Sequence, residues 1–153
     1  TGVDLSVGVL EQLAGVDNIR YIKDATGNTG RLLSISNRLG HRIRLFAASA
    51  HIPVFVMMLG GVGWMAGPAC IIPRQSVELY ELCRAGRWEE AMALQRRLWP
   101  VNEVFQKYSL AGAVKTALEL QGFDVGEPLA PQPRLDAAAR EDIARALRGA
   151  GAL

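Results

Sequence analysis

The sequence is organised around residues 19–28, which read Ile-Arg-Tyr-Ile-Lys-Asp-Ala-Thr-Gly-Asn. Apolar positions alternate up to Lys23, which is typical of a short strand, and the Thr-Gly-Asn turn then leads into a helical pattern. The carboxyl ends of parallel strands are where α/β folds carry their chemistry. Lys23 is therefore the residue that we select as a candidate catalyst.

Strands and helices alternate on both sides of this stretch. We expect strands at 19–23, 43–47 and 60–67. We expect one helix through Leu13 with Ser6 as its cap, a second that starts at Asn28 or Thr29 and ends at Leu39, and a third that begins within residues 49–53 and runs to about Leu59. Alternation with short connections predicts parallel βα units. Three strands cannot close a sheet, and a parallel sheet is covered on both faces, so this half looks unfinished by itself.

From Pro73 onward the pattern is helical only. The predicted helices are 76–85, 87–98, 101–107, 110–120 and a last one from Asp136 to Arg148. Pro100 is expected to bend or end the second of them, and the chain is expected to fray from Gly149. We therefore divide the chain into residues 1–72, with strands and helices, and residues 73–153, with helices alone.

Composition favours an ordinary globular protein. The 153 residues are 50% apolar, and 17 basic against 15 acidic residues give a net charge of +2, which does not favour nucleic acid as a partner. No apolar run is long enough to span a membrane, and no metal-binding spacing is present. Cys70 and Cys83 are expected to be buried free thiols, and the expected location is cytoplasmic. The first residue is Thr1, so the chain is expected to be a piece of something larger.

At such a site the amine of Lys23 could act as a nucleophile. A free lysine has a pKa of about 10.4, so its amine is almost fully protonated at neutral pH. Desolvation favours the neutral amine, which can attack a ketone and form a Schiff base whose iminium stabilises an adjacent carbanion. The residue types alone leave open that Lys23 is an ordinary strand-end lysine that reaches solvent.

Residues 61–66, Gly-Val-Gly-Trp-Met-Ala, fit the dinucleotide fingerprint G-x-G-x-x-A. That motif requires a helix to open at its end, but Pro68 and Pro73 interrupt one, and bulky Trp64 sits where the backbone should approach a pyrophosphate. We favour a strand bordered by glycines. A nucleotide-binding oxidoreductase stays as a less favoured alternative.

Residues 22–28, Ile-Lys-Asp-Ala-Thr-Gly-Asn, resemble the Schiff-base lysine signature of the dihydrodipicolinate synthase / N-acetylneuraminate lyase family. Further segments resemble the family in the same order: residues 1–5 its stretch after strand five, residues 60–63 with Pro73 its strand-eight region, and residues 114–122 and 128–131 its C-terminal helices.

The resemblance implies the C-terminal half of a (β/α)8 TIM barrel, strands six to eight, followed by a helical extension. It implies that Lys23 forms an iminium with pyruvate or another 2-keto acid, with no further cofactor. It also implies that the proton-relay tyrosine and the carboxylate-binding arginine precede Thr1, so the isolated chain is expected to be inactive. Members commonly form homodimers or homotetramers.

By the same resemblance, substrate contacts fall at four positions, Ala25, Ala48, Ser49 and Met65. The Met65 backbone carbonyl would face the lysine. Residues 48–50 read Ala-Ser-Ala where the family's synthases usually carry Gly-Asp-Asp, and the lyases of sialic acid also tend to keep acidic residues there. The missing carboxylates favour a smaller or less polar second substrate. Aldol addition or cleavage, dehydration or cleavage of a 2-keto-3-deoxy sugar acid, and a degenerate barrel that acts as a binding module all remain open.

Overall fold

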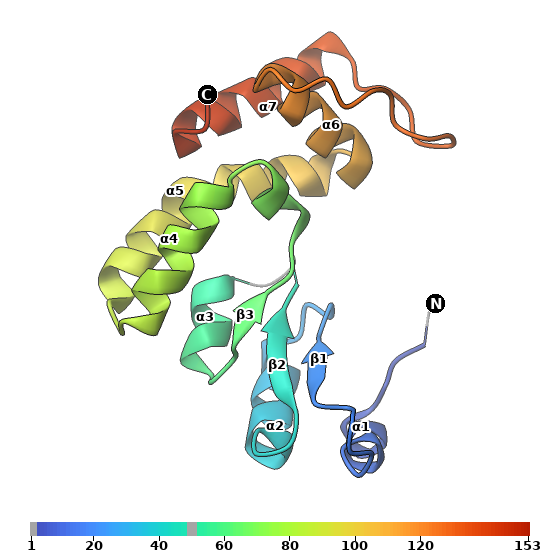
Figure 1. The fold of residues 1–153 in the computed structure, drawn as a ribbon, viewed down its shortest axis with the longest axis vertical. Helices are drawn as coiled ribbons and strands as arrows, with labels where there is room; N and C mark the ends of the chain where they lie inside the picture. The colour runs from blue at the N-terminus through green and yellow to red at the C-terminus, as the bar shows by residue number, and fades with distance from the viewer. Residues whose placement is uncertain (1–2, 49–51) are drawn as a thin grey trace. The chain divides into compact units, whose positions relative to one another are not determined.

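The structure is a computed structural model that describes residues 3–48 and 52–153. The chain divides into two units, Thr1–Met65 and Ala66–Leu153, which Figure 1 shows in one view. The first unit holds all the described strands, and the second is helical. The predicted division between residues 72 and 73 concerns where a barrel would end, and it stays a prediction.

The described sheet of the first unit has three short parallel strands in the order β1-β2-β3. The strands are β1 (Tyr21–Lys23), β2 (Arg44–Ala47) and β3 (Gly63–Trp64). The parallel βα arrangement is therefore confirmed. The third strand is shorter than predicted because Gly60 has a φ of +87° and Gly61 packs tightly on the Val56 carbonyl, where a Cβ would lie 2.6 Å from the oxygen. These two glycines form the turn that leaves the preceding helix.

Three helices accompany the strands, namely α1 (Val7–Leu13), α2 (Thr29–Leu39) and α3 (Pro53–Met58). The predicted N-cap Ser6 is confirmed, and of the two predicted starts of α2, Asn28 is the N-cap. The Ser6 side chain accepts a hydrogen bond from the Val9 amide, and the Asn28 side chain accepts one from the Arg31 amide at 3.0 Å. Pro53 occupies the first turn of α3, where its missing N–H costs nothing.

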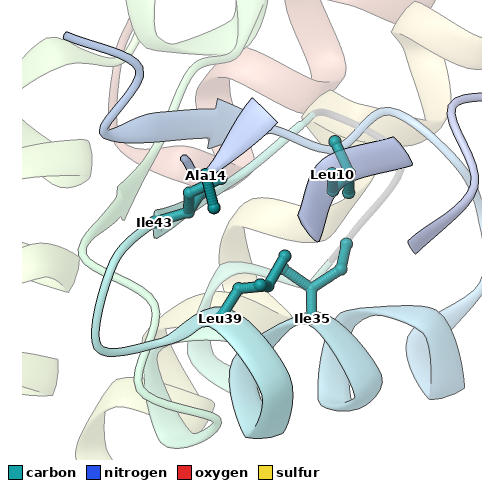
Figure 2. Packing of buried hydrophobic residues seen from close by; sticks show 5 residues of the cluster. All are labelled: Leu10, Ala14, Ile35, Leu39 and Ile43. Carbon is teal, nitrogen blue, oxygen red and sulfur yellow. The ribbon is translucent and has the colours of Figure 1, made fainter. Parts of the chain in front are cut away.

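Two apolar clusters hold the first unit together. Figure 2 shows the first, in which Leu10 and Ala14 from α1 and its C-cap face Ile35, Leu39 and Ile43. The second joins the helical face of the sheet to α2 and α3, and its buried members are Leu32, Leu45, Ala47 and Val56. Burial of aliphatic side chains on this scale supplies the main stabilising free energy of such a unit.

The second unit begins with a short 3-10 segment (Gly67–Cys70) and continues with four helices. They are α4 (Pro73–Arg84), α5 (Trp88–Lys107), α6 (Leu110–Leu120) and α7 (Ala137–Ala150). Helix α5 packs against α4 and α7, and α6 packs against α7. Among the described residues, no helix combines the length and the apolar character needed to cross a bilayer.

Two predictions about the ends of these helices are wrong. Pro100 does not end its helix, because α5 runs through it from Trp88 to Lys107, and both Pro100 and Arg96, one turn earlier, are exposed. The chain does not fray at Gly149 either. Helix α7 runs to the buried Ala150, and Gln75 Nε2 donates to the carbonyls of Ala150 and Gly151 at 3.1 and 3.0 Å.

Candidate active site

The carboxyl ends of the three strands lie at one edge of the sheet. Lys23 pairs in register with Phe46, and Phe46 pairs with Gly63. Ala47 pairs in turn with Trp64. The residues that follow β1 and β3 extend the ladder, since Asp24 N donates to the Phe46 carbonyl and Met65 N to the Ala47 carbonyl. The strand order thus brings Lys23 to the same edge as Met65, two of the residues predicted for the site.

Lys23 lies on the sheet face opposite the helices. Ile22 and Leu45 pack into the clusters with α2, so the alternating neighbours Lys23 and Phe46 point the other way. On that face the rings of Tyr21 and Phe46 lie 5.9 Å apart at 55°. Lys23 is exposed, which is the outcome expected of a strand-end lysine on a sheet face that no described helix of its unit covers.

The predicted substrate positions differ in exposure. Ala25 is exposed directly after the strand end, Ala48 is buried, and Met65 is 51% exposed. Ser49 and Ala50 lie outside the described residues. The structure therefore groups Lys23, Ala25, Ala48 and Met65 at the carboxyl edge, while their contacts with a substrate stay a prediction.

Sequence reasoning missed Asp24, a residue that is only 3% exposed. Its Oδ1 accepts hydrogen bonds from the Thr26 amide at 2.8 Å and the Thr26 hydroxyl at 2.6 Å, and its Oδ2 accepts from Arg31 Nε at 2.7 Å. Burial by itself raises the pKa of Asp24, but the hydrogen bonds from Thr26 and Arg31 and the Arg31 charge outweigh it and bring that pKa below its usual value. The buried group is a carboxylate at neutral pH.

Alternation along the strand did indicate that Asp24 points away from Lys23. The signal that could have revealed its partners is the spacing Asp-x-Thr followed by Arg31 in the first turn of α2. An aspartate two residues before a threonine commonly forms such a turn, and an arginine at this distance can reach back to it.

The glycine-rich segment 61–66 is the glycine-bordered strand that we favoured. Gly63 and Trp64 form β3, and a 3-10 segment follows instead of a helix that opens at the end of the motif. The context required for a dinucleotide site is therefore missing at this motif. Within the described residues, no group of three His, Cys, Asp or Glu side chains is placed to hold a metal ion.

The two cysteines are free thiols, but only one is buried. Cys83 lies in the core of the second unit, whereas Cys70 is exposed at the end of the 3-10 segment. The prediction that both are buried is therefore wrong for Cys70.

Comparisons with known proteins agree on one family. The model of the dihydrodipicolinate synthetase family matches residues 1–150. A 4-hydroxy-tetrahydrodipicolinate synthase of Acidiphilium cryptum is 32% identical over 151 residues, 99% of this chain and 52% of that protein. A probable mitochondrial 4-hydroxy-2-oxoglutarate aldolase of Emericella nidulans is 40% identical over 118 residues, 77% of this chain and 38% of that protein. The chain thus spans about half the length, or less, of these curated relatives.

Solved structures show the same partial coverage. A dihydrodipicolinate synthase from Acinetobacter baumannii in complex with pyruvate is 30% identical with a TM-score of 0.91, over 100% of this chain and 53% of that one. A putative dihydrodipicolinate synthetase from Pseudomonas aeruginosa is 25% identical with a TM-score of 0.92, over 97% and 52%. The three parallel strands and the helices after them are consistent with part of a barrel.

Proposed function

The chain belongs to the dihydrodipicolinate synthetase family, and from that premise we propose that it supplies strands six to eight of a (β/α)8 barrel and the helices that follow. The barrel acts as a Schiff-base lyase on a 2-keto acid, with Lys23 as the nucleophile. The site needs no metal or further cofactor, because the covalent lysine adduct itself supplies the electron sink.

The position and availability of the Lys23 amine carry this proposal. The lysines of the sequence are Lys23, Lys107 and Lys115. Lys107 Nζ is paired with Asp142 at 2.6 Å, and Lys115 Nζ donates to the Val125 carbonyl at 2.6 Å. Within residues 3–48 and 52–153, no hydrogen bond or ion pair of the Lys23 amine is seen. Lys23 is thus the lysine that lies at a strand end and whose amine has no acceptor among the residues that the structure describes.

The reaction follows from the chemistry of a neutral amine. Lys23 Nζ adds to the C2 carbonyl, and loss of water from the adduct gives a protonated iminium. In the cleavage direction the electrons of the C3–C4 bond flow into the iminium, the C4 hydroxyl loses its proton to a base, and an aldehyde departs. The enamine then takes a proton at C3, and hydrolysis of the iminium releases pyruvate and the free lysine. The resemblance assigns the base to a tyrosine upstream of this chain.

For the second substrate we propose a 4-hydroxy-2-oxo acid that releases a small aldehyde. Residues 48–50, Ala-Ser-Ala, offer no carboxylate to bind sugar hydroxyls. The relative named as a 4-hydroxy-2-oxoglutarate aldolase is 40% identical, against 32% for the relative named as a synthase. Formation of 4-hydroxy-tetrahydrodipicolinate, and dehydration or cleavage of a 2-keto-3-deoxy sugar acid, are the alternatives within the family.

Borohydride reduction in the presence of pyruvate tests the proposal in the full-length protein that carries this chain. The expected result is a secondary amine on the peptide that contains Lys23, located by mass spectrometry. Lys107→Arg and Lys115→Arg serve as matched controls that leave the adduct unchanged, whereas Lys23→Arg and Lys23→Ala abolish it. The proposal fails if no 2-keto acid labels Lys23, and if the wild type also lacks lyase activity, a non-catalytic binding barrel is favoured. It fails as well if Lys23→Ala retains activity, which would mean that the reaction does not use Lys23.

The choice of substrate is tested separately. Cleavage of 4-hydroxy-2-oxoglutarate, synthesis of 4-hydroxy-tetrahydrodipicolinate and cleavage of a 2-keto-3-deoxy sugar acid are compared by kcat/KM on the same preparation. We expect the first to be fastest, and a preference for either of the others would overturn the assignment without touching the role of Lys23. We further propose that the protein is a homodimer or homotetramer, and light scattering after size exclusion measures the molar mass that tests this. The proposed location is the cytoplasm.

A further inference from the structure

A chain of contacts closes around the turn that follows Lys23. It starts at the buried carboxylate of Asp24, which binds Thr26 and Arg31 as described. The Arg31 guanidinium continues the chain, because Nη2 donates to the Leu5 carbonyl and Nη1 lies 3.5 Å from an Asp4 carboxylate oxygen. Arg31 therefore ties together the segment before α1, through Asp4 and Leu5, the end of β1, through Asp24, and the first turn of α2, to which it belongs.

This network does more than cap a helix. The N-terminus of α2 already has its cap, since Asn28 Oδ1 accepts from the Arg31 amide and the Thr26 hydroxyl lies 3.4 Å from the Asn28 amide. The Asp24–Arg31 ion pair is added to that cap, and the Arg31 side chain is only 12% exposed. A buried ion pair is costly to form unless its hydrogen bonds are well satisfied, so its presence requires a reason beyond helix initiation.

The strand end that carries Lys23 needs such an anchor. Strand β1 has only three residues, and directly after it Asp24 N donates a hydrogen bond to the Phe46 carbonyl of β2 at 3.2 Å. Ends of short strands open readily unless other contacts hold them. Because Lys23 and Asp24 point to opposite faces, the anchored carboxylate fixes the backbone under Lys23 without touching its amine.

We propose that Asp24 and Arg31 are positioning residues for Lys23: their ion pair, completed by Thr26, holds the end of β1 so that the amine points to the carbonyl that it attacks. This inference rests on the proposed Schiff-base function. It assigns no proton transfer and no substrate contact to either residue. A misplacement of about 1 Å in such a geometry can lower a rate on the order of 100-fold.

The sharpest test is a matched pair at Thr26 in the full-length protein. Thr26→Val removes the hydroxyl that donates to Asp24 at 2.6 Å but keeps the shape, whereas Thr26→Ser keeps the donor. With the substrate that the wild type cleaves, Thr26→Val is expected to lower kcat on the order of 10-fold with little change in KM, and Thr26→Ser to stay near wild type. Asp24→Asn is expected to lower kcat further than Thr26→Val does. Asp24→Glu, which retains a negative charge for Arg31, is expected to have a kcat between those of Asp24→Asn and the wild type.

Ser36→Ala controls for a general loss of stability. It removes a hydrogen bond of 2.7 Å to the Leu59 carbonyl in the same unit, far along α2 from the turn. The comparison is made at a temperature where circular dichroism shows that Ser36→Ala and Thr26→Val are both folded. Under these conditions Ser36→Ala is expected to keep the wild-type kcat. The positioning role is overturned if the kcat values of Thr26→Val and Asp24→Asn, corrected for the folded fraction of each variant, equal the kcat of Ser36→Ala. If the wild type itself is not labelled by any 2-keto acid, the proposed function fails instead, so the two failures are distinct.

Discussion

Phe46 is the register partner of Lys23 on the neighbouring strand, so the two side chains leave the same face of the sheet side by side. Phe46 also faces Gly63 in the next strand, and its ring packs against Tyr21. The lysine therefore stands beside an aromatic layer on a face that no described helix of its unit covers. The Phe46 ring leaves little room for a side chain at position 63, which a substitution of Gly63 can test.

Gly63→Ala is expected to destabilise the chain through Phe46. A Cβ at this position would lie 3.2 Å from Cε1 of Phe46, closer than an ordinary contact, so the ring must shift. Overpacking of this kind costs about 1–3 kcal/mol. Gly63 also has a φ of +158°, which residues with a side chain rarely adopt, so strain of the backbone adds to this cost. Urea unfolding measures the change.

A double-mutant cycle with Phe46→Leu separates the steric contribution from the effect of the backbone. We expect Gly63→Ala to cost less in the Phe46→Leu background than in the wild type, since the smaller side chain can yield. Equal costs in the two backgrounds would show that the Phe46 ring does not limit this position.

The cysteines are expected to differ sharply in reactivity. Cys70 is exposed, whereas burial raises the pKa of the Cys83 thiol and lowers its thiolate fraction. Iodoacetamide at neutral pH should therefore label Cys70 rapidly and Cys83 only when the second unit unfolds. Peptide mass spectrometry across a urea series measures both rates on one sample. Simultaneous labelling in the absence of urea would contradict the burial of Cys83.

The pattern of the sequence predicted the parts of the fold that depend on local chemistry. Ser6, Asn28 and Asp136 cap helices because each offers a side-chain oxygen to an amide three residues on. Parallel strands followed from strand–helix alternation, and Lys23 fell at a strand end because the alternation stops there. These features need no knowledge of distant residues.

The features that the sequence did not reveal depend on tertiary contacts. The partner of Asp24 lies across a turn, and Gln75 fixes the end of α7 from a helix far away in the sequence. Whether Pro100 breaks α5 depends on which side of the helix faces water. Periodicity assigns a residue to a face, but it does not tell which group meets it there.

The ion pair between α5 and α7 predicts an acid transition of the second unit. The hydrogen bond from Lys107, with another from the Tyr108 hydroxyl at 2.7 Å, lowers the pKa of Asp142 from 3.8 to about 2. A group with a lowered pKa in the folded state stabilises the fold above its unfolded pKa and loses that effect as the pH falls through the folded value. The contribution of Asp142 should therefore be full above about pH 5 and vanish near pH 2.

Asp142→Asn isolates this effect when unfolding free energies are measured from pH 7 to pH 2. The variant should be less stable than the wild type at neutral pH and equal to it near pH 2. Glu103→Gln, an exposed residue of α5 for which the described chain shows no ion pair, serves as the control and should differ little from wild type at any pH. A deficit of Asp142→Asn that does not change with pH would mean that packing, not charge, is lost.

Two buried glutamines of the second unit should respond in opposite directions to the same substitution. Gln95 in α5 is 3% exposed, and its Oε1 has no hydrogen-bond partner among the described residues. Gln75 in α4 is 5% exposed, and its amide nitrogen donates to the carbonyls of Ala150 and Gly151. A buried polar atom without a partner costs about 1–3 kcal/mol, whereas a satisfied one contributes about 1 kcal/mol.

Gln95→Met is therefore expected to raise the thermal midpoint of the second unit, because methionine keeps the length of the side chain and removes the unsatisfied oxygen. Gln75→Met is expected to lower it, because it removes the side-chain donor to the Ala150 carbonyl at the end of α7, while the Gly151 carbonyl keeps the hydrogen bond from Arg74 Nη2. Thermal unfolding followed by circular dichroism compares the two variants with wild type. A loss of stability in Gln95→Met equal to that in Gln75→Met would mean that the Gln95 amide is satisfied in solution, for example by a buried water molecule.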